Sequence, residues 1–392
     1  MRRWGIYLVI LAALGGGVLS AIALHQYVAI SSVGLTTPSF CNISETFNCD
    51  IVTASSYATM FGVPTAGLAL LFFAIQLLFG IWAALQRESG RGHATVGFLL
   101  GLGALIPSAW LVYVMAAILR TYCLSCLGVD LAILGIVLGW LGSRGVLIRQ
   151  LTFRHIVMGP LVTILVIGAV GLLFLVNIGM ATEGEGRRPS AAMIAEALQA
   201  FEQQPAQQID IDASQHARWG AADAKVHILE ISDFQCPFCK EAAFRIKPYL
   251  AEFRNDVQVT FLHYPLDSSC NPELQRSLHP MACLAARAAV CAEVAGRFWA
   301  YHDAIFHHQP QLSRTWLIEE AKRLGLDPER FGQCLDDPAT DALVRRDIAI
   351  GRALQVAGTP SVYLNGRKLS GWQSKDFLRA AVRAEIAKQQ EM

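Results

Sequence analysis

Five long apolar stretches constrain the fold of this chain more than any other feature. They span residues 5–29, 61–85, 94–119, 123–141 and 156–179. A helix needs about 20 apolar residues to cross the roughly 30 Å hydrocarbon layer of a bilayer, and each stretch is of about that length. Only 16% of the 392 residues are charged, whereas ordinary soluble domains have about 25%. We therefore expect much of the chain to lie in a membrane.

Basic residues predict how these stretches are oriented. Arg2 and Arg3 precede the first stretch, and further arginines lie between the second and third stretches and between the fourth and fifth. The loop of residues 31–60 has no Lys or Arg. By the positive-inside rule, the amino terminus is then cytoplasmic and this loop faces outward. Five crossings would place everything after residue 180 outside as well.

The composition changes after the fifth stretch. The segment ATEGEGRRPS (181–190) has the composition of a polar linker, and 191–204 has amphipathic helical patterning. From about residue 219 the chain alternates strand-like and helix-like runs, which predicts a mixed α/β domain. The expected strands are 225–231, 257–264, 361–364 and 367–370, and the expected helices are 277–307, 313–325, 338–356 and 375–389. The net charge of +1 gives no reason to expect a nucleic-acid partner.

The motif DFQCPFCK (233–240) places two cysteines at a strand-to-helix junction. The positive end of the helix stabilises a thiolate at Cys236, which makes it an attacking sulfur and a good leaving group. The alternative is half of a structural zinc site, which needs a second cysteine pair at suitable spacing. The other cysteines of this domain are dispersed, so the pattern favours a redox-active Cys236–Cys239 pair and no metal.

Two further cysteine pairs belong to the apolar half of the chain. Cys123 and Cys126 of TYCLSCLGVD begin the fourth stretch at its outward end, and Cys41 and Cys49 lie in the outward loop. Thiol–disulfide exchange moves two electrons at a time, so each station of an electron path needs two cysteines. One alternative is a plain structural disulfide in the loop. Another is a set of soft-metal ligands, which predicts His or Met beside the cysteines, and neither CxxC pair has one within three residues.

The remaining four cysteines lie in the α/β domain, where unpaired thiols would scramble with the catalytic pairs. Cys283 and Cys291 are eight residues apart on one expected helix, or about 12 Å, which is too far for a bridge. Cys270 precedes the first turn of this helix, and Cys334 follows the expected helix 313–325. We therefore predict two structural disulfides, Cys270–Cys283 and Cys291–Cys334.

The segment VAGTPSVYLNG (356–366) places Thr359-Pro360 just before a strand. Together with the CxxC pair, it makes residues 215–392 resemble the thioredoxin superfamily, and more narrowly the DsbA-like thiol oxidases with an inserted helical region. The resemblance implies that Pro360 is the cis-proline facing the CxxC pair, and that Glu230 is the buried acid that assists proton transfer. Phe238 is a departure, because the most oxidising members of that family have histidine there.

The apolar half resembles the vitamin K epoxide reductase family over about residues 1–142. The resemblance rests on four expected bundle helices, the loop cysteine pair, and the motifs CD…S…GVP and YCLSC. It implies that Cys123 and Cys126 face a quinone (ubiquinone or menaquinone) and that Cys41 and Cys49 are a shuttle pair. It also implies a role for Ser55 in the quinone site. Fusion of such a domain to a thioredoxin-like domain through an extra span is a known bacterial arrangement of this family.

Asp130 lies one helical turn after Cys126, inside an apolar stretch. An ionisable residue within a membrane span is a candidate functional residue by default. One interpretation is that Asp130 binds or protonates the quinone. The other is a carboxylate that is paired within the bundle or extends toward the membrane surface.

We therefore expect a multi-domain protein of the bacterial inner membrane. Residues 1–142 would form an all-α four-helix transmembrane domain, 143–215 a fifth transmembrane helix and linker, and 216–392 an α/β thioredoxin-fold domain on the periplasmic side. The expected function is a disulfide-forming oxidase, which takes electrons from reduced secreted or periplasmic proteins and delivers them to the membrane quinone pool. The expected path runs through Cys236/Cys239, Cys41/Cys49 and Cys123/Cys126. The alternatives are a thiol reductase or isomerase running in reverse, and a membrane-anchored metal-binding protein.

Overall fold

The computed structural model describes residues 3–32, 39, 41–43, 46–60, 62–85, 90–143, 168, 171, 190–209, 211–212 and 215–391. These residues divide into two compact units, one up to residue 171 and one from residue 190. The fifth apolar stretch, 156–179, lies almost entirely outside the described residues, so the fifth crossing stays a prediction. The expected domain boundaries at 142 and 215 also stay predictions.

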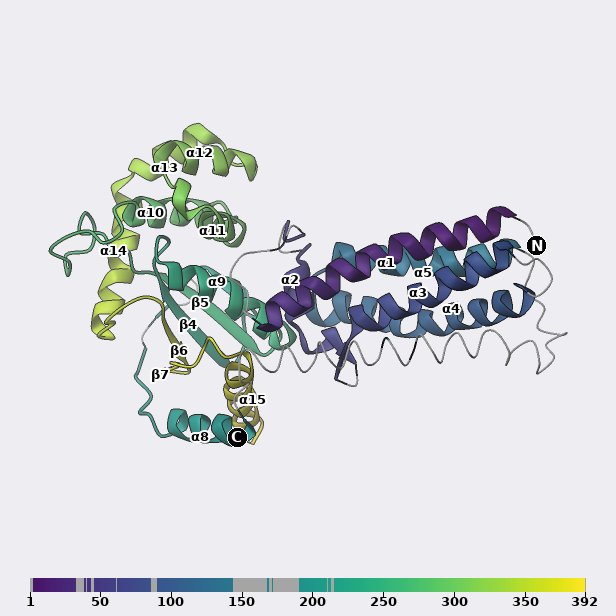
Figure 1. Ribbon diagram of the computed structural model, residues 1–392. Coiled ribbons are helices and arrows are strands. Elements are labelled where there is room, and N and C mark those ends of the chain that lie inside the picture. Colours follow the sequence, from purple (N-terminus) through teal and green to yellow (C-terminus); the bar gives the residue numbers. More distant parts are fainter. Residues whose placement is uncertain are drawn as a thin grey trace. The chain divides into compact units, whose positions relative to one another are not determined.

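The amino-terminal unit is a bundle of four long helices that run side by side (Figure 1). They are α1 (Arg3–Ser32), α3 (Thr65–Leu85), α4 (Gly90–Tyr113) and α5 (Leu124–Ser143). Among the described residues, these helices, with α4 continued to Leu119, are long and apolar enough to cross a membrane. The first four predicted apolar stretches are therefore confirmed as helices.

Large aromatic side chains fill the centre of the bundle. Phe73, Phe79 and Trp140 are at most 1% exposed. Gln76 lies among them, where its side-chain oxygen accepts the Trp140 Nε1 hydrogen at 2.9 Å and its Nε2 donates to the Gly97 carbonyl at 2.8 Å. A buried amide costs free energy unless it is hydrogen-bonded. These two bonds therefore fix α3, α4 and α5 in one register.

Short elements lie at one end of the bundle. They are α2 (Cys49–Ala54), the 3-10 turn η1 (Ser56–Ala58), the hairpin strands β1 (Thr59–Met60) and β2 (Val63–Pro64), and the π-helix η2 (Val114–Leu119) that continues α4. Helix α2 contacts α1 and η2. Asn48 caps α2, because its side-chain oxygen accepts the amide hydrogens of Asp50 and Ile51. This end of the bundle holds the loop cysteines and the start of α5.

The carboxyl-terminal unit is built on a five-stranded sheet of order β3-β5-β4-β6-β7. The strands are β3 (Arg218–Gly220), β4 (Val226–Ser232), β5 (Val257–His263), β6 (Ser361–Leu364) and β7 (Arg367–Lys368). Strands β4 and β5 are parallel, with Val226 opposite Val257, and the other pairs are antiparallel. The predicted hairpin joins β6 to β7 through Asn365 and Gly366, which both have positive φ, as a tight hairpin turn requires.

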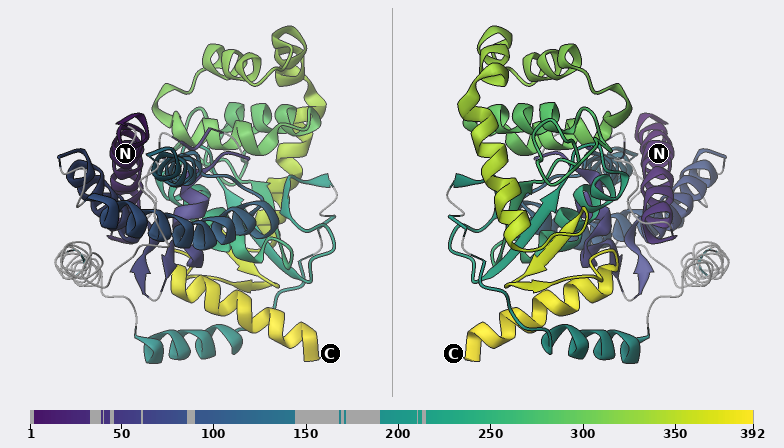
Figure 2. Two further views of the ribbon diagram at one scale, coloured as in Figure 1. Left: turned by 90° about the vertical axis from the view of Figure 1, so that its right-hand side faces the viewer. Right: turned by 90° about the vertical axis from the view of Figure 1, so that its left-hand side faces the viewer.

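Helices cover the sheet, and Figures 1 and 2 show them in two groups. They are α8 (Ala191–Glu202), α9 (Pro237–Leu250), α10 (Ala282–Val294), α11 (Phe298–His307), α12 (Arg314–Arg323), α13 (Pro328–Asp336), α14 (Pro338–Ala353) and α15 (Lys375–Glu391), with the short turns η6 (Ala251–Phe253) and η7 (Gln309–Gln311). Helix α15 packs against α8, α9 and β4. Helices α10 and α14 bury apolar side chains against Leu229 and Ile231 of β4. Helices α10 to α13 form the expected helical insertion, at the end of the unit away from α8 and α15 in Figure 2.

Three elements of this unit differ from the sequence-based expectation. The run 277–307 forms two helices, α10 and α11, because Gly296 adopts a φ of +69° between them. Helix α13 was not predicted, although Asp327 caps it and Pro328 opens it. Strand β3 was not predicted either, because three residues are too few to show an alternating pattern.

Candidate functional site

The Cys236–Cys239 pair lies at the junction of β4 and α9. Strand β4 is buried except at His227. Pro237 is the first residue of α9, a position where proline fits well because an amide hydrogen there would have no partner within the helix. Cys236 is the N-cap residue, so its sulfur lies at the positive end of the helix. Both cysteines are free thiols, with Cys236 4% exposed and Cys239 fully buried.

The two thiols differ in acidity. The pKa of Cys236 is lowered to about 6, chiefly by a hydrogen bond from the Cys239 thiol and further by the amides of Cys239 and Phe238, while burial opposes this effect. Burial raises the pKa of Cys239. At neutral pH, Cys236 is therefore mostly thiolate and is suited to attack and to leave, and Cys239 is the protonated partner.

Pro360 and Glu230 occupy positions that the thioredoxin resemblance implies for them. The Thr359–Pro360 peptide bond is cis, and the Thr359 carbonyl oxygen lies 3.3 Å from Cys236 Sγ. Glu230 lies on β4 and is 2% exposed, and burial raises its pKa to about 7. A carboxyl group with this pKa can accept or release a proton at neutral pH, which a buried thiol requires in order to react.

Sequence reasoning missed a buried carboxylate that organises the turn before Cys236. Asp233 is 1% exposed and accepts the amide hydrogens of Gln235 at 2.6 Å, Cys236 at 3.2 Å and Leu266 at 2.6 Å. His279 Nδ1 lies 2.9 Å from Asp233 Oδ2, and this hydrogen bond raises the pKa of His279. An Asp three residues before an N-cap is a turn signal that was present in the sequence. Nothing in the sequence marks His279, which precedes α10 in the helical insertion.

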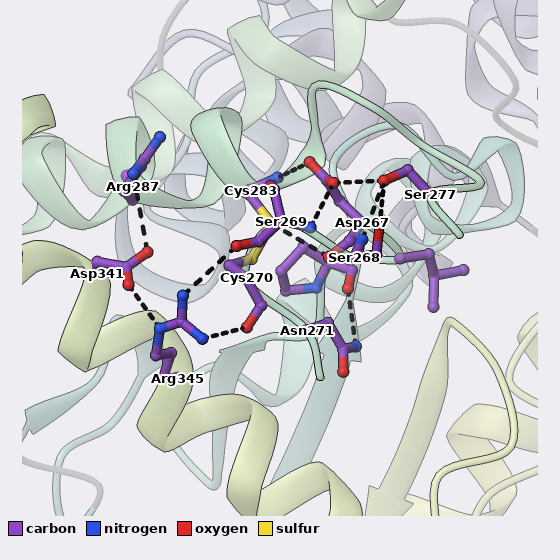
Figure 3. The surroundings of a disulfide bond; sticks show 12 residues. Asp267, Ser268, Ser269, Cys270, Asn271, Ser277, Cys283, Arg287, Asp341 and Arg345 are labelled. Carbon is purple, nitrogen blue, oxygen red and sulfur yellow. Dashed lines mark hydrogen bonds and ion pairs between the residues drawn. A yellow bond between two sulfur atoms is a disulfide. The ribbon is translucent and has the colours of Figure 1, made fainter. Parts of the chain in front are cut away.

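The other four cysteines of this unit form the two predicted disulfides, Cys270–Cys283 and Cys291–Cys334. Figure 3 shows the first, with Asp267 on one side and Arg345 on the other. Arg345 donates to the Cys270 carbonyl at 3.1 Å, and its Nε donates to Asp341 at 2.6 Å. The second disulfide joins α10 to α13. These four cysteines are therefore disulfide-bonded, and both disulfides stabilise the helical insertion.

In the amino-terminal unit, backbone hydrogen bonds join the loop that carries Cys41 and Cys49 to the segment before α5. The Asn48 amide donates to the Tyr122 carbonyl at 3.0 Å, and the Tyr122 amide donates to the Thr46 carbonyl at 2.7 Å. Asp50 is 3% exposed and accepts the Ser39 amide hydrogen at 2.9 Å. These bonds hold both loop cysteines beside the first residues of α5.

The sulfur atoms of the loop pair and of Cys123 gather in one buried place. Cys41 and Cys49 form a disulfide, and the Sγ atoms of Cys41, Cys49 and Cys123 all lie within 4.8 Å of one another. Cys123 and Cys126 are free thiols, and the Cys126 amide donates to Cys123 Sγ at 3.2 Å. Cys123 is therefore close enough to the loop disulfide for exchange after a small movement.

A cavity of about 50 Å³ adjoins Cys126. Its lining is mostly apolar and comprises Ala23, Tyr27, Val52, Thr53, Tyr57, Ala58, Thr65, Ala66, Leu111, Val114, Met115, Leu119 and Cys126. Ser55 is buried, and its hydroxyl donates to the Val52 carbonyl at 2.7 Å. The neighbours of Ser55, rather than Ser55 itself, thus line the cavity, and the role of Ser55 stays a prediction.

Asp130 on α5 accepts a hydrogen bond from the Ser108 hydroxyl of α4. Its other carboxylate oxygen is buried and has no hydrogen-bond partner within the part of the chain that the structure describes. The structure thus pairs Asp130 within the bundle, one turn below Cys126. The binding or protonation of a quinone by Asp130 stays a prediction.

Two family profiles match the chain, one for each unit. The vitamin K epoxide reductase family matches residues 7–141, and the DSBA-like thioredoxin domain matches residues 227–383. Among curated proteins, the chain is 33% identical over 172 residues to the Na(+)/H(+) antiporter NhaA 3 of Salinispora tropica, covering 44% of this chain and 25% of the antiporter. It is 36% identical over 152 residues to the Na(+)/H(+) antiporter NhaA of Herminiimonas arsenicoxydans, covering 39% of this chain and 22% of the antiporter. The chain thus spans about a quarter of the length of these relatives.

Solved structures resemble part of the chain in fold. BdbD from Bacillus subtilis, in its oxidised form, has 21% identity and a TM-score of 0.41, covering 47% of this chain and 100% of BdbD. The thiol-disulfide exchange protein alpha-DsbA2 from Wolbachia pipientis has 20% identity and a TM-score of 0.39, covering 50% of this chain and 98% of that protein. The two family matches identify residues 7–141 as a domain of the vitamin K epoxide reductase family and residues 227–383 as a DsbA-like thioredoxin domain.

Proposed function

We propose that this chain is a disulfide-forming oxidase that delivers electrons from protein thiols to a membrane quinone. The observation that carries the proposal is the gathering of Cys41, Cys49 and Cys123, with their sulfur atoms within 4.8 Å of one another. Cys126, three residues after Cys123, lines an apolar cavity. Members of the vitamin K epoxide reductase family use quinones in disulfide relays, and the sulfur cluster beside a mostly apolar cavity supports such a relay here.

The first half of the cycle takes place at Cys236 and Cys239. A substrate thiolate attacks the Cys236 sulfur of the oxidised pair, and a second substrate thiolate then displaces Cys236, so that the substrate leaves with a disulfide. The lowered pKa of Cys236 makes it the favoured leaving group. Glu230, with its pKa raised to about 7, is suited to relay the proton of Cys239.

The second half returns the pair to its oxidised form. The Cys236 thiolate attacks Cys41 of the loop disulfide, and Cys239 resolves the mixed disulfide. One thiolate of the reduced loop pair then attacks Cys123 of an oxidised Cys123–Cys126 disulfide. The other loop thiolate resolves the mixed disulfide, so the loop disulfide forms again and Cys123 and Cys126 are left reduced. Cys126 finally passes two electrons to the quinone as the Cys123–Cys126 disulfide forms again, and the quinone takes up two protons and leaves as quinol. Asp130 is our proposed proton donor for this step.

This function implies reduced secreted or periplasmic proteins as substrates and the bacterial inner membrane as location, with the thioredoxin-like domain on the periplasmic side. A reductase or isomerase would use the same cysteines in reverse. A quinone is an oxidant relative to thiols, which favours net oxidation.

The test uses the purified full-length chain, a reduced unfolded substrate and a quinone, with oxygen excluded. Quinol should form in step with substrate disulfides. Cys126→Ser should abolish quinol formation, whereas the matched Cys291→Ser/Cys334→Ser double variant should keep it, because that pair is structural. Quinol formation at the normal rate by Cys126→Ser would overturn the proposal.

A further inference from the structure

Four sulfur-containing side chains meet at the outer end of the helix bundle. Cys41, Cys49, Cys123 and Met115 belong to one buried cluster and are each at most 1% exposed. The Cys123 amide donates to Met115 Sδ at 3.4 Å. A thioether therefore lies beside the thiol group on which the relay depends.

The chain path explains how Met115 reaches Cys123, eight residues further along. Helix α4 changes into the π-helix η2 one residue before Met115, and Arg120 ends η2 with a left-handed φ of +51°. The amides of Arg120 and Thr121 both donate to the Met115 carbonyl. This tight reversal brings the chain back past Met115, and π-helical turns are frequent at functional sites.

The chemistry of this cluster is that of a soft-metal site. Thiolate and thioether ligands favour soft ions such as Cu(I) over hard cations such as Mg²⁺, Ca²⁺ and Mn²⁺. In the described part of the chain, no histidine or carboxylate joins the three cysteines as a further ligand. Three sulfurs bound at about 2.3 Å to a common ion lie about 4 Å apart. The three Sγ atoms already lie within 4.8 Å of one another, so only a small movement is needed once the loop disulfide is reduced.

We propose that the reduced cluster binds one Cu(I) ion, through the thiolates of Cys41, Cys49 and Cys123 with the Met115 thioether as a further ligand. Binding releases the thiol protons and changes no oxidation state. The positive end of α5, which begins at Leu124, offsets part of the thiolate charge. The oxidised loop, with its Cys41–Cys49 disulfide, lacks two of these ligands and does not bind the ion.

A bound Cu(I) ion has a direct consequence for the relay. It holds the loop cysteines reduced and occupies Cys123, so thiol–disulfide exchange through the loop stops. This consequence rests on the proposed function, but the binding itself does not. A binding measurement therefore tests the site even if electrons take another route.

The experiment uses the full-length chain in detergent with Cys236→Ser and Cys239→Ser, which remove the other CxxC pair. The protein is reduced with a phosphine without oxygen, and alkylation with peptide mapping verifies the thiols of Cys41 and Cys49. Cu(I) is then titrated against bicinchoninate, a coloured Cu(I) chelator. We expect one more bound Cu(I) per chain in this reduced protein than in the oxidised protein. X-ray absorption should detect sulfur neighbours alone around this copper.

Matched variants separate this site from simple chelation by a CxxC pair. Cys41→Ser and Cys123→Ser should each lower the Cu(I) affinity by roughly a hundredfold, and the volume-conserving Met115→Leu by about tenfold. Cys126→Ser should leave the affinity within about threefold, because its sulfur is not one of the three that lie within 4.8 Å of one another. Two results would overturn the proposal. One is binding that is lost in Cys126→Ser but kept in Cys41→Ser and Met115→Leu, and the other is equal binding by the oxidised and reduced protein.

Discussion

Replacing Glu230 by Gln should stabilise the carboxyl-terminal unit at alkaline pH. Glu230 lies on β4 at 2% exposure, and its Oε1 is buried with no hydrogen-bond partner among the described residues. Burial disfavours the charged form, which raises the pKa of this carboxyl group from 4.5 to about 7. Gln has nearly the same shape and carries no charge, so it mimics the neutral acid at every pH.

The size and sign of this effect follow from the shifted pKa. Because the folded pKa is raised, the neutral acid contributes stability that is fully present below about pH 4.5 and is lost as the pH rises through 7. At about 1.4 kcal/mol for each pH unit, the rise from 4.5 to about 7 amounts to about 3 kcal/mol. The wild-type unit should lose that much stability relative to Glu230→Gln between about pH 4.5 and pH 8.

The assay is guanidinium denaturation of residues 190–392 from pH 4 to pH 9, with both structural disulfides intact and Cys236–Cys239 kept reduced. The difference in unfolding free energy between the variant and the wild type should rise with pH and level off above about pH 8. Parallel curves over the whole range would refute the reasoning. So would a variant that becomes the less stable protein at high pH.

Three further predictions concern other parts of the chain. Cys239→Ser should trap a mixed disulfide between Cys236 and Cys41, visible by non-reducing peptide mapping, and an adduct at Cys49 alone would reverse the proposed order. Asp130→Asn should slow quinone reduction or shift its pH dependence and leave thiol exchange at Cys236 unchanged, and an unaltered pH–rate profile would make Asp130 structural. The Cys291–Cys334 disulfide closes a loop of 43 residues, and replacing both cysteines by serine should lower the unfolding free energy by about 4 kcal/mol. The Cys270–Cys283 disulfide closes a loop of 13 residues, and its removal should cost about 3 kcal/mol. Equal or reversed losses in denaturant unfolding would contradict the chain-entropy argument.

The elements that the sequence predicted well are those with strong local signals. The four described spans are long and apolar, β4 and β5 are rich in Val, Ile, Leu and Phe, and Asn365-Gly366 marks a tight hairpin turn. A Cys283–Cys291 bridge was excluded because both lie on one helix, and the position of Cys270 just before that helix then favoured Cys270–Cys283 and Cys291–Cys334. Each of these conclusions needed only the period, length or spacing of residues along the sequence.

The features that escaped prediction depend on contacts between distant segments or on a single backbone angle. Gly296 divides one helical pattern into two helices. His279 acquires its role only because the chain folds it onto Asp233, 46 residues earlier. Met115 is too far from Cys123 in sequence to look like a companion of the CxxC pair, and a π-helix brings the two together. The sequence alone therefore did not show that the Met115 sulfur joins those of Cys41, Cys49 and Cys123 at this site.

The most direct test of the account counts the electrons that the chain itself can hold. Fully oxidised full-length protein is mixed with an excess of a reduced dithiol substrate, without quinone or oxygen, and the substrate disulfides formed per chain are counted. Three cysteine pairs in series predict three disulfides per chain, and added quinone should then make the oxidation continuous. A count of one, with no further turnover on adding quinone, would mean that Cys236 and Cys239 act alone and would contradict the relay.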